Sequence, residues 1–287
     1  MRNRKLDEVL ENQRKLELRI RELYISNAPI EEIQKAYDDF HSFIMNHGVR
    51  GEMMGDYVYK AQLSIIDNIL LKCIGKGKSV LEIGAGDGHF LVACVRNENE
   101  TVGIDISLFV LKKLEAKLNR KKLNIQLRFG DARHLEFPNA KFDYVVSKDL
   151  VEHIPSADLQ HHLREVWRVL KPKGCYLVWT PSRLLGPTSL GTHLREYTLA
   201  ELLSEFKRVH FDPYVLSLHV FVVSRKPVTI PKSIIPVIVN YEKILGAFLK
   251  LVHLPSQHPF LYVVVPPICI AARKIGLHEY LLDRIEE

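Results

Sequence analysis

Three glycines at alternate positions are the residues whose spacing most directly indicates chemistry. The apolar run of residues 80–83 leads into Gly84, Gly86 and Gly88, and an apolar pattern with helical spacing begins at Phe90. This order predicts a strand, a tight turn and a helix. Glycine has no Cβ, so the turn can adopt positive φ angles and let a ligand lie against bare backbone.

Acidic residues flank this turn. Asp105 ends the next predicted strand, twenty-one positions after Gly84, where a doubly wound nucleotide fold binds ribose hydroxyls. Glu82 precedes Gly84 by two positions and would repel a pyrophosphate but suit a cationic ligand. His89 stands where the dinucleotide motif G-x-G-x-x-G has its third glycine. These residues alone leave a cationic ligand, a dinucleotide and a structural turn open.

Three segments together resemble the class I S-adenosylmethionine-dependent methyltransferases. Residues 82–88 are similar to that family's first motif, E-x-G-x-G-x-G. Residues 142–154 are similar to its FD-x-V … EHI segment, and residues 170–174 read LKPKG, another of its features. S-adenosylmethionine carries a sulfonium and an amino group and has no phosphate, which agrees with an acidic residue before the turn. The resemblance covers residues 70 to 210 well and both ends poorly.

The resemblance implies an α/β fold of the Rossmann-like type. It predicts a three-layer sandwich around a seven-stranded, mostly parallel sheet with an antiparallel last strand, and an N-terminal helical cap. Residues 1–70 are predicted to form the cap, which is also a candidate dimerisation segment, and residues 71–287 the methyltransferase domain. A lid or insertion is expected at about 181–197 and about 228–258.

Apolar periodicity and helix breakers locate the elements that must position these residues. Helices are predicted at 5–25, from residue 30, and at 108–118, 156–170, 199–206 and 234–254. Strands are predicted at 80–83, 125–129, 142–147, 175–179, 215–223, 261–265 and 268–273. One more strand, between the first two of these, is predicted to end at residue 105. The near-heptad pattern of residues 5–25 predicts packing on its own domain or, alternatively, a homodimer contact.

Composition limits the class of protein. The 287 residues are 47% hydrophobic and 26% charged, enough for a folded core. The net charge of +6 permits an anionic partner without requiring one. Four scattered cysteines without metal-ligand spacing are typical of a reducing cytoplasm and predict no disulfide scaffold. The charged N-terminus does not resemble a signal peptide, and no apolar run is long enough to predict a transmembrane segment.

The resemblance also implies a set of residues that bind the cofactor S-adenosylmethionine. An acidic residue after the third strand accepts the adenine amino group in that family, and the next backbone N–H donates to the ring. Asp131 and Ala132 match these positions, with a turn or helix-capping role as the alternative for Asp131. The full implied set is Glu82, Gly84, Ala85, Gly86, Gly88, Asp105, Ile106, Asp131, Ala132 and Lys148.

Catalytic and substrate-binding residues are less clearly indicated. His193 lies in a segment similar to the family's H-x-R-E-[FY]-T/S pattern and is the preferred general base, because a neutral imidazole can take a hydroxyl proton. His153 is a second candidate, either as a base or as a positioning contact, and both histidines could instead hold their loops. The candidates for substrate binding are Arg50, Tyr57, Tyr59, Arg195 and Tyr197.

Missing motifs narrow the acceptor. Residues 147–150 read Ser-Lys-Asp-Leu, which is neither the Asn/Asp-Pro-Pro-Tyr/Phe run of base-amine enzymes nor a Pro-Cys nucleophile. The basic residues of 112–122 have no interleaved aromatic residues, so nucleic-acid binding is not expected. No cluster indicates a metal. The sequence therefore predicts a small-molecule methyltransferase acting on a hydroxyl, with N-methylation of an amine and a non-catalytic cofactor-binding scaffold as alternatives.

Overall fold

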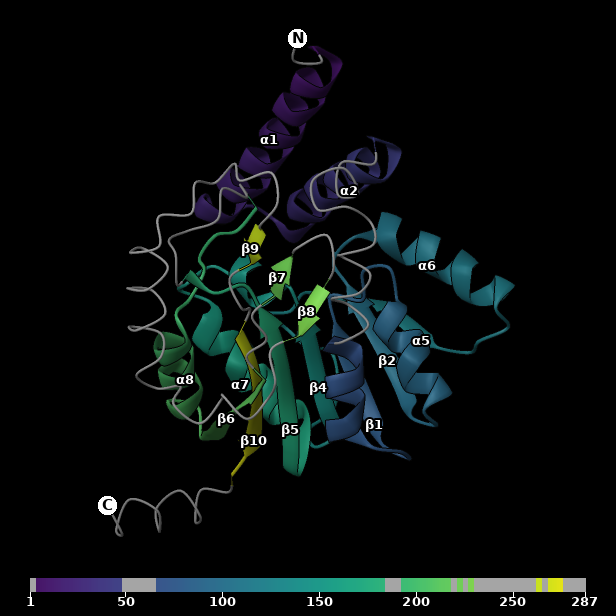
Figure 1. Ribbon diagram of the computed structural model, residues 1–287, viewed down its shortest axis with the longest axis vertical. Helices are drawn as coiled ribbons and strands as arrows, with labels where there is room; N and C mark the ends of the chain where they lie inside the picture. The colour runs from purple at the N-terminus through teal and green to yellow at the C-terminus, as the bar shows by residue number, and fades with distance from the viewer. Residues whose placement is uncertain are drawn as a thin grey trace.

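A seven-stranded sheet forms the centre of the protein (Figure 1). The computed structural model describes residues 4–47, 66–183, 192–217, 221–223, 227–229, 262–264 and 268–275. The strands are β1 (Ser79–Ile83), β2 (Glu100–Asp105), β3 (Gln126–Phe129), β4 (Phe142–Lys148), β5 (Leu170–Thr180), β6 (Phe211–Ser217) and β10 (Ile268–Lys274). Their order is β3-β2-β1-β4-β5-β10-β6, and β10 pairs antiparallel with both neighbours. The predicted mostly parallel sheet with an antiparallel last strand is confirmed.

The strand order reverses beside β1, which pairs in parallel with β2 on one side and β4 on the other. Ligands of open α/β sheets bind beyond the carboxyl ends of the strands at such a reversal. Those ends carry the glycine turn after β1, Asp105 of β2 and Lys148 of β4. The topology thus brings the predicted cofactor residues to one edge of the sheet.

Helices cover both faces of the sheet. The helix of residues 66–74 and α5 (His89–Arg96) share a core cluster with Val80, Val146 and Leu177. On the other face lie α7 (Leu159–Val169) and α8 (Leu199–Lys207), and α6 (Leu108–Arg120) packs beside α5. A capping box between Thr198 and Glu201 starts α8.

The N-terminal helices form a hairpin. α1 (Arg4–Ile25) and α2 (Ile30–His47) meet through a cluster that includes Ile20, Leu23 and Phe40. Leu18 on α1 is 43% exposed, so the homodimer alternative stays a prediction. The helix of residues 66–74 spans the predicted domain boundary at 70/71, and that boundary also stays a prediction.

The C-terminal part differs from the predicted strand limits. β6 spans Phe211–Ser217 rather than 215–223, because Asp212 and Pro213 are tolerated on an edge strand that pairs only with β10. β7 (Phe221–Val223), β8 (Pro227–Thr229) and β9 (Tyr262–Val264) form a separate three-stranded sheet. Of the two described strands at 262–264 and 268–274, β10 and not β9 pairs in the main sheet.

Two predicted elements near this region are not covered. The apolar helix at 234–254 lies outside the described residues, as does most of the insertion at 228–258. Within the described part of the chain, no helix combines the length and apolar character needed to cross a membrane.

A buried histidine links the two layers beneath the site. His162 of α7 donates from Nδ1 to the Ala132 carbonyl oxygen at 2.7 Å, and its Nε2 lies 2.9 Å from the Tyr176 hydroxyl. Tyr176 Oη is 2.7 Å from Ser147 Oγ, so the chain of hydrogen bonds reaches β4. Burial lowers the pKa of His162 from 6.5 to about 4. The side chain is therefore neutral in the folded protein at neutral pH.

Folding stability is expected to decrease as the pH falls from about 6.5 toward 4, because the unfolded chain binds a proton at His162 that the folded protein excludes. Lowering the pH from 7 to 5 should decrease the unfolding free energy by about 2 kcal/mol through His162 alone. Urea denaturation of the protein and of His162→Gln at both pH values measures it. Carboxylates that titrate in the same range affect both proteins alike, so the difference between their losses of unfolding free energy is due to His162. An equal loss in the two proteins would contradict the assignment.

Candidate functional site

The glycine turn after β1 leaves its backbone bare at the carboxyl edge of the sheet. Gly84, Gly86 and Gly88 have φ angles of 77°, 50° and 70°, which L side chains rarely adopt. The amides of Gly84 and Ala85 both donate to the Ile104 carbonyl oxygen at 2.9 Å. A Cβ on Gly86 would meet nothing closer than 3.9 Å, so this position opens to a ligand.

Asp105 holds this turn against the end of β2. Its Oδ2 accepts from the Gly86 amide at 3.0 Å, and its Oδ1 accepts from the Ser107 amide at 2.9 Å. Burial raises the pKa of Asp105 to about 6, although both amides act in the opposite direction. Each carboxylate oxygen has a second lone pair, so Asp105 can also accept hydrogen bonds from a ligand.

A cluster of two acidic residues, Asp67 and Glu82, lies on the other side of the turn together with Lys148. Lys148 Nζ is 3.0 Å from Asp67 Oδ1 and 3.7 Å from Glu82 Oε1, and Asp67 Oδ2 is 2.5 Å from His89 Nδ1. Glu82 is 1% exposed, and burial raises its pKa to about 8 in spite of Lys148. Its Oε2 accepts no hydrogen bond from a described residue. The group presents a buried acceptor that a cationic donor would satisfy.

The loop after β3 lies against β2, because the Gly130 amide donates to the Asp105 carbonyl oxygen at 3.1 Å. Arg133 donates hydrogen bonds from its guanidinium to two carboxylates. Its Nη2 lies 2.7 Å from Asp131 Oδ2, and its Nη1 lies 3.2 Å from Asp158 Oδ2. A ligand that bonds Asp131 must therefore share its carboxylate with Arg133. The Ala132 carbonyl oxygen accepts a hydrogen bond from His162. The backbone N–H of Ala132 can therefore serve other contacts.

The helical hairpin reaches this edge through Asp38 of α2. Its Oδ1 accepts from Ser107 Oγ at 2.6 Å and from the Phe109 amide at 2.9 Å. Ile106, a predicted cofactor residue, packs against the hydrophobic cluster of the hairpin. Tyr37 of the same helix is buried, and burial raises its pKa well above the usual range. The predicted cap thus contacts the predicted nucleoside region directly.

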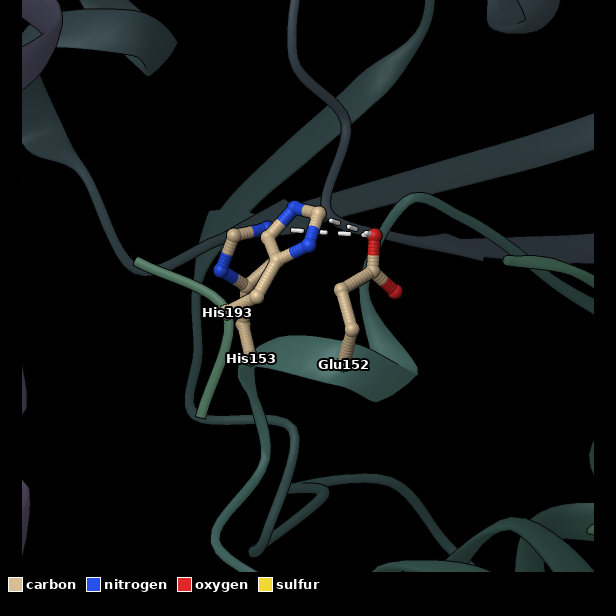
Figure 2. A group of neighbouring side chains, drawn as sticks. All are labelled: Glu152, His153 and His193. Carbon is tan, nitrogen blue, oxygen red and sulfur yellow. Dashed lines mark ion pairs between the residues drawn. The ribbon is translucent and has the colours of Figure 1, made fainter. Parts of the chain in front are cut away.

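Figure 2 shows the third group, in which His153 and His193 converge on the carboxylate of Glu152. Glu152 and His153 lie on η1 (Val151–His153), and His193 comes forty positions later. The Nε2 atom of each histidine is 3.9 Å from Glu152 Oε1, and the two rings are edge to face at 5.0 Å between centroids. Both candidate catalytic histidines therefore meet at one point.

Hydrogen bonds fix both rings. His153 Nδ1 donates to the Thr192 carbonyl oxygen at 2.9 Å, and His193 Nδ1 lies 2.6 Å from Glu196 Oε1. Glu152 Oε2 accepts from Thr180 Oγ1 at 2.8 Å, while burial and then the charge of Asp149 raise the pKa of Glu152 well above its usual range. Such pairs hold each imidazole in one tautomer and orientation.

The predicted substrate residues are placed unevenly. Arg195 stacks over the Tyr197 ring at 4.9 Å, but Tyr197 is 1% exposed and belongs to the large core cluster. Its ring serves packing, and its burial gives no support to the prediction that it contacts a substrate. Arg50, Tyr57 and Tyr59 lie outside the described residues.

Sequence reasoning missed the acidic partners of these groups. Asp38, Asp67, Glu152 and Glu196 each contact a predicted site residue or its neighbour. Glu152 had a sequence signal, since it stands directly before His153 in the EHI segment. Asp38 and Asp67 have none, because they lie on helices far from the glycine turn in the sequence.

This chain is similar to several known proteins. Residues 80–174 match a family model described as a methyltransferase domain. The chain is 26% identical over 162 residues to a probable S-adenosylmethionine-dependent methyltransferase of Mycolicibacterium smegmatis, covering 55% of this chain and 60% of that protein. It is 31% identical over 122 residues to the demethylmenaquinone methyltransferase of a Geobacillus species, covering 41% of this chain and 50% of that protein.

Among solved structures, the YcgJ protein of Bacillus subtilis superposes with a TM-score of 0.56 at 19% identity, covering 74% of this chain and 99% of that chain. At this identity the likeness shows the fold alone. The sequence matches span 60% and 50% of the two curated relatives, so they bear on the domain rather than on the relatives as whole proteins.

The turn itself can be tested through Gly88, where a Cβ would lie 2.2 Å from Leu114 Cδ1. Gly88→Ala is expected to lower the unfolding free energy by about 1–2 kcal/mol for the left-handed backbone and about 1–3 kcal/mol more for overpacking. Gly77→Ala is the matched control, with a φ of 69° and nothing within 4 Å of the added Cβ. Equal losses in the two variants, measured by urea denaturation, would contradict the packing role.

Proposed function

We propose that this protein, whose residues 80–174 match a methyltransferase-domain model, is a class I methyltransferase that transfers a methyl group from S-adenosylmethionine to a hydroxyl group of a small-molecule acceptor. We also propose a cytoplasmic location, which the four cysteines support because none of them forms a disulfide. We propose no nucleic-acid partner. A homodimer formed through α1 remains an alternative assembly.

The observation that carries the proposal is the buried acidic group beside the bare glycine turn. A pyrophosphate at the turn would face Glu82 and Asp67, with Lys148 already paired to both. The methionine ammonium would instead supply the donor that Glu82 Oε2 lacks among the described residues. This charge pattern favours a sulfonium nucleoside over a dinucleotide.

The remaining cofactor contacts follow from the strand ends. We assign the ribose hydroxyls to Asp105, the bare backbone of Gly84 to Gly88 to the methionine portion, and the adenine to Ile106, Asp131 and Ala132. Lys148 keeps Glu82 and Asp67 together and neutralises part of their charge. These assignments retain every cofactor residue that the sequence predicts.

Methyl transfer from a sulfonium is an in-line displacement with a neutral leaving group. The protein therefore mainly aligns the acceptor with the methyl group and excludes water. A hydroxyl acceptor must also lose its proton. We assign that proton to His193 Nε2, because Glu196 holds the Nδ1 side of the ring and His193 is only 10% exposed. His153 then positions the 192–197 segment through Thr192.

Two alternatives are kept. The protein could N-methylate a small amine, for which His193 would play the same role, or it could bind the cofactor without catalysis. The Geobacillus relative is named a demethylmenaquinone methyltransferase, and a small-molecule acceptor in its name favours a small-molecule acceptor over a macromolecular one here.

Calorimetry with S-adenosylmethionine, S-adenosylhomocysteine and NAD tests the cofactor assignment. Both sulfur nucleosides should bind and NAD should not. A preference for NAD would overturn the proposal. Formation of S-adenosylhomocysteine with a panel of phenols, sugars and amines then separates an O-methyltransferase from an N-methyltransferase and from a scaffold.

Asp105→Asn should weaken S-adenosylmethionine binding by about 1–3 kcal/mol, because the amide offers one acceptor fewer to the ribose and to Gly86. Asp87→Asn is the control, since it removes the same charge from a side chain that is 63% exposed in the same turn. Calorimetry on both variants gives the comparison, and an unchanged affinity in Asp105→Asn would remove Asp105 from the site.

His193→Ala should slow turnover about 10²–10⁴-fold while the affinity for S-adenosylmethionine stays unchanged. Turnover is measured with the acceptor that reacts fastest in the panel. His161→Ala, which removes an exposed histidine of α7, is the matched control. Normal turnover in His193→Ala would return that residue to a structural role.

A further inference from the structure

Three hydrogen-bond acceptors converge at the group of Glu152, His153 and His193 (Figure 2). One ligand atom of each residue lies within 4.8 Å of the other two. Glu152 is 0% exposed, yet its Oε1 accepts no hydrogen bond from a described residue. A fully buried carboxylate oxygen without a donor is costly, so it requires a cationic or hydrogen-donating occupant.

The hydrogen bonds of the two rings decide what faces that oxygen. His153 Nδ1 must carry the proton, because the Thr192 carbonyl oxygen can only accept. The Glu196 carboxylate likewise accepts from His193 Nδ1–H. In these tautomers the lone pair of each ring lies on Nε2, and both Nε2 atoms are 3.9 Å from Glu152 Oε1.

We propose that Glu152 Oε1, His153 Nε2 and His193 Nε2 bind a divalent first-row metal ion, with Zn²⁺ as the representative. Two imidazoles and one carboxylate are a donor set that such metals accept. The proposal departs from the expectation, drawn from the sequence, that the protein holds no metal.

The surroundings favour a metal over a proton. Metal-bound histidines usually donate their other N–H to a carboxylate or a carbonyl oxygen. Here Glu196 and Thr192 provide one of each. The charged groups that most strongly affect Glu152 are also carboxylates, Asp149 and Glu196, so a divalent cation would neutralise charge that a single proton would leave.

The geometry needs a small contraction. Ligand atoms around a tetrahedral zinc with bonds of about 2.1 Å lie about 3.4 Å apart, roughly half an ångström closer than the carboxylate and the imidazoles lie now. The side chain of His153 is 21% exposed, which leaves a path for the metal and room for a water ligand.

The metal site rests on this geometry and not on the proposed methyl transfer. Both roles use the same lone pair of His193, so His193 cannot act as the general base in a chain that holds the metal. The titration below contains no S-adenosylmethionine, so its result and the calorimetry on the cofactor can fail independently.

Full-length protein freed of its purification tag and of metal is titrated with Zn²⁺ against a chromogenic chelator. One Zn²⁺ per chain is expected. Replacement by Co²⁺ should give visible bands of nitrogen and oxygen coordination without a thiolate charge-transfer band. Absence of stoichiometric binding, or a thiolate band that places the metal on cysteine, overturns the proposal even if every variant fails to fold.

Variants then assign the ligands. His153→Gln and His193→Gln should each weaken Zn²⁺ binding about tenfold or more, and Glu196→Gln, which changes only the partner of His193, about tenfold. His161→Gln should bind Zn²⁺ like the unaltered protein, since it lies on the exposed side of α7. Unchanged affinity in His193→Gln overturns the site.

Discussion

The hydrogen bond from the Gly86 amide to the Asp105 carboxylate joins the turn after β1 to the end of β2. The same carboxylate accepts from the Ser107 amide, and Ser107 in turn caps α6 and donates to Asp38 of the helical hairpin. One buried acid therefore connects the glycine turn, α6 and the hairpin. If it were lost, the bare backbone, the strand end and the cap would no longer share a fixed geometry.

Buried carboxylates are the common feature of this edge of the sheet. Burial raises the pKa of Glu82 to about 8 and that of Asp105 to about 6, and it raises the pKa of Glu152 well above its usual range. Glu82 and Glu152 each keep an oxygen that no described residue satisfies. Excess acceptors in a low-dielectric edge favour positively charged ligands. A sulfonium nucleoside and a divalent metal are two such ligands, proposed at separate groups.

Predictions from local sequence held where the cause was local. The predicted glycine turn follows from the φ preferences of glycine. The predicted start of a helix at residue 30 follows from Pro29 directly before it, which has no backbone N–H to donate. The limits of β6 were missed because tolerance for Pro213 depends on that strand lying at the edge of the sheet. Tyr197 is a candidate substrate residue by its motif, and the structure shows that it is buried in the large core cluster, so its contact with a substrate stays a prediction.

The sequence by itself determined the fold class and the candidate cofactor residues, because short motifs predict strand, turn and helix and resemble those of a family with a common fold and cofactor. The tertiary structure alone decided which charges meet. Asp67 joins Glu82 and Lys148, and His193 joins His153 and Glu152, through helix packing and loop docking that no local pattern records. Electrostatic character depends on distances across the fold and on burial, and both arise only when the layers pack together.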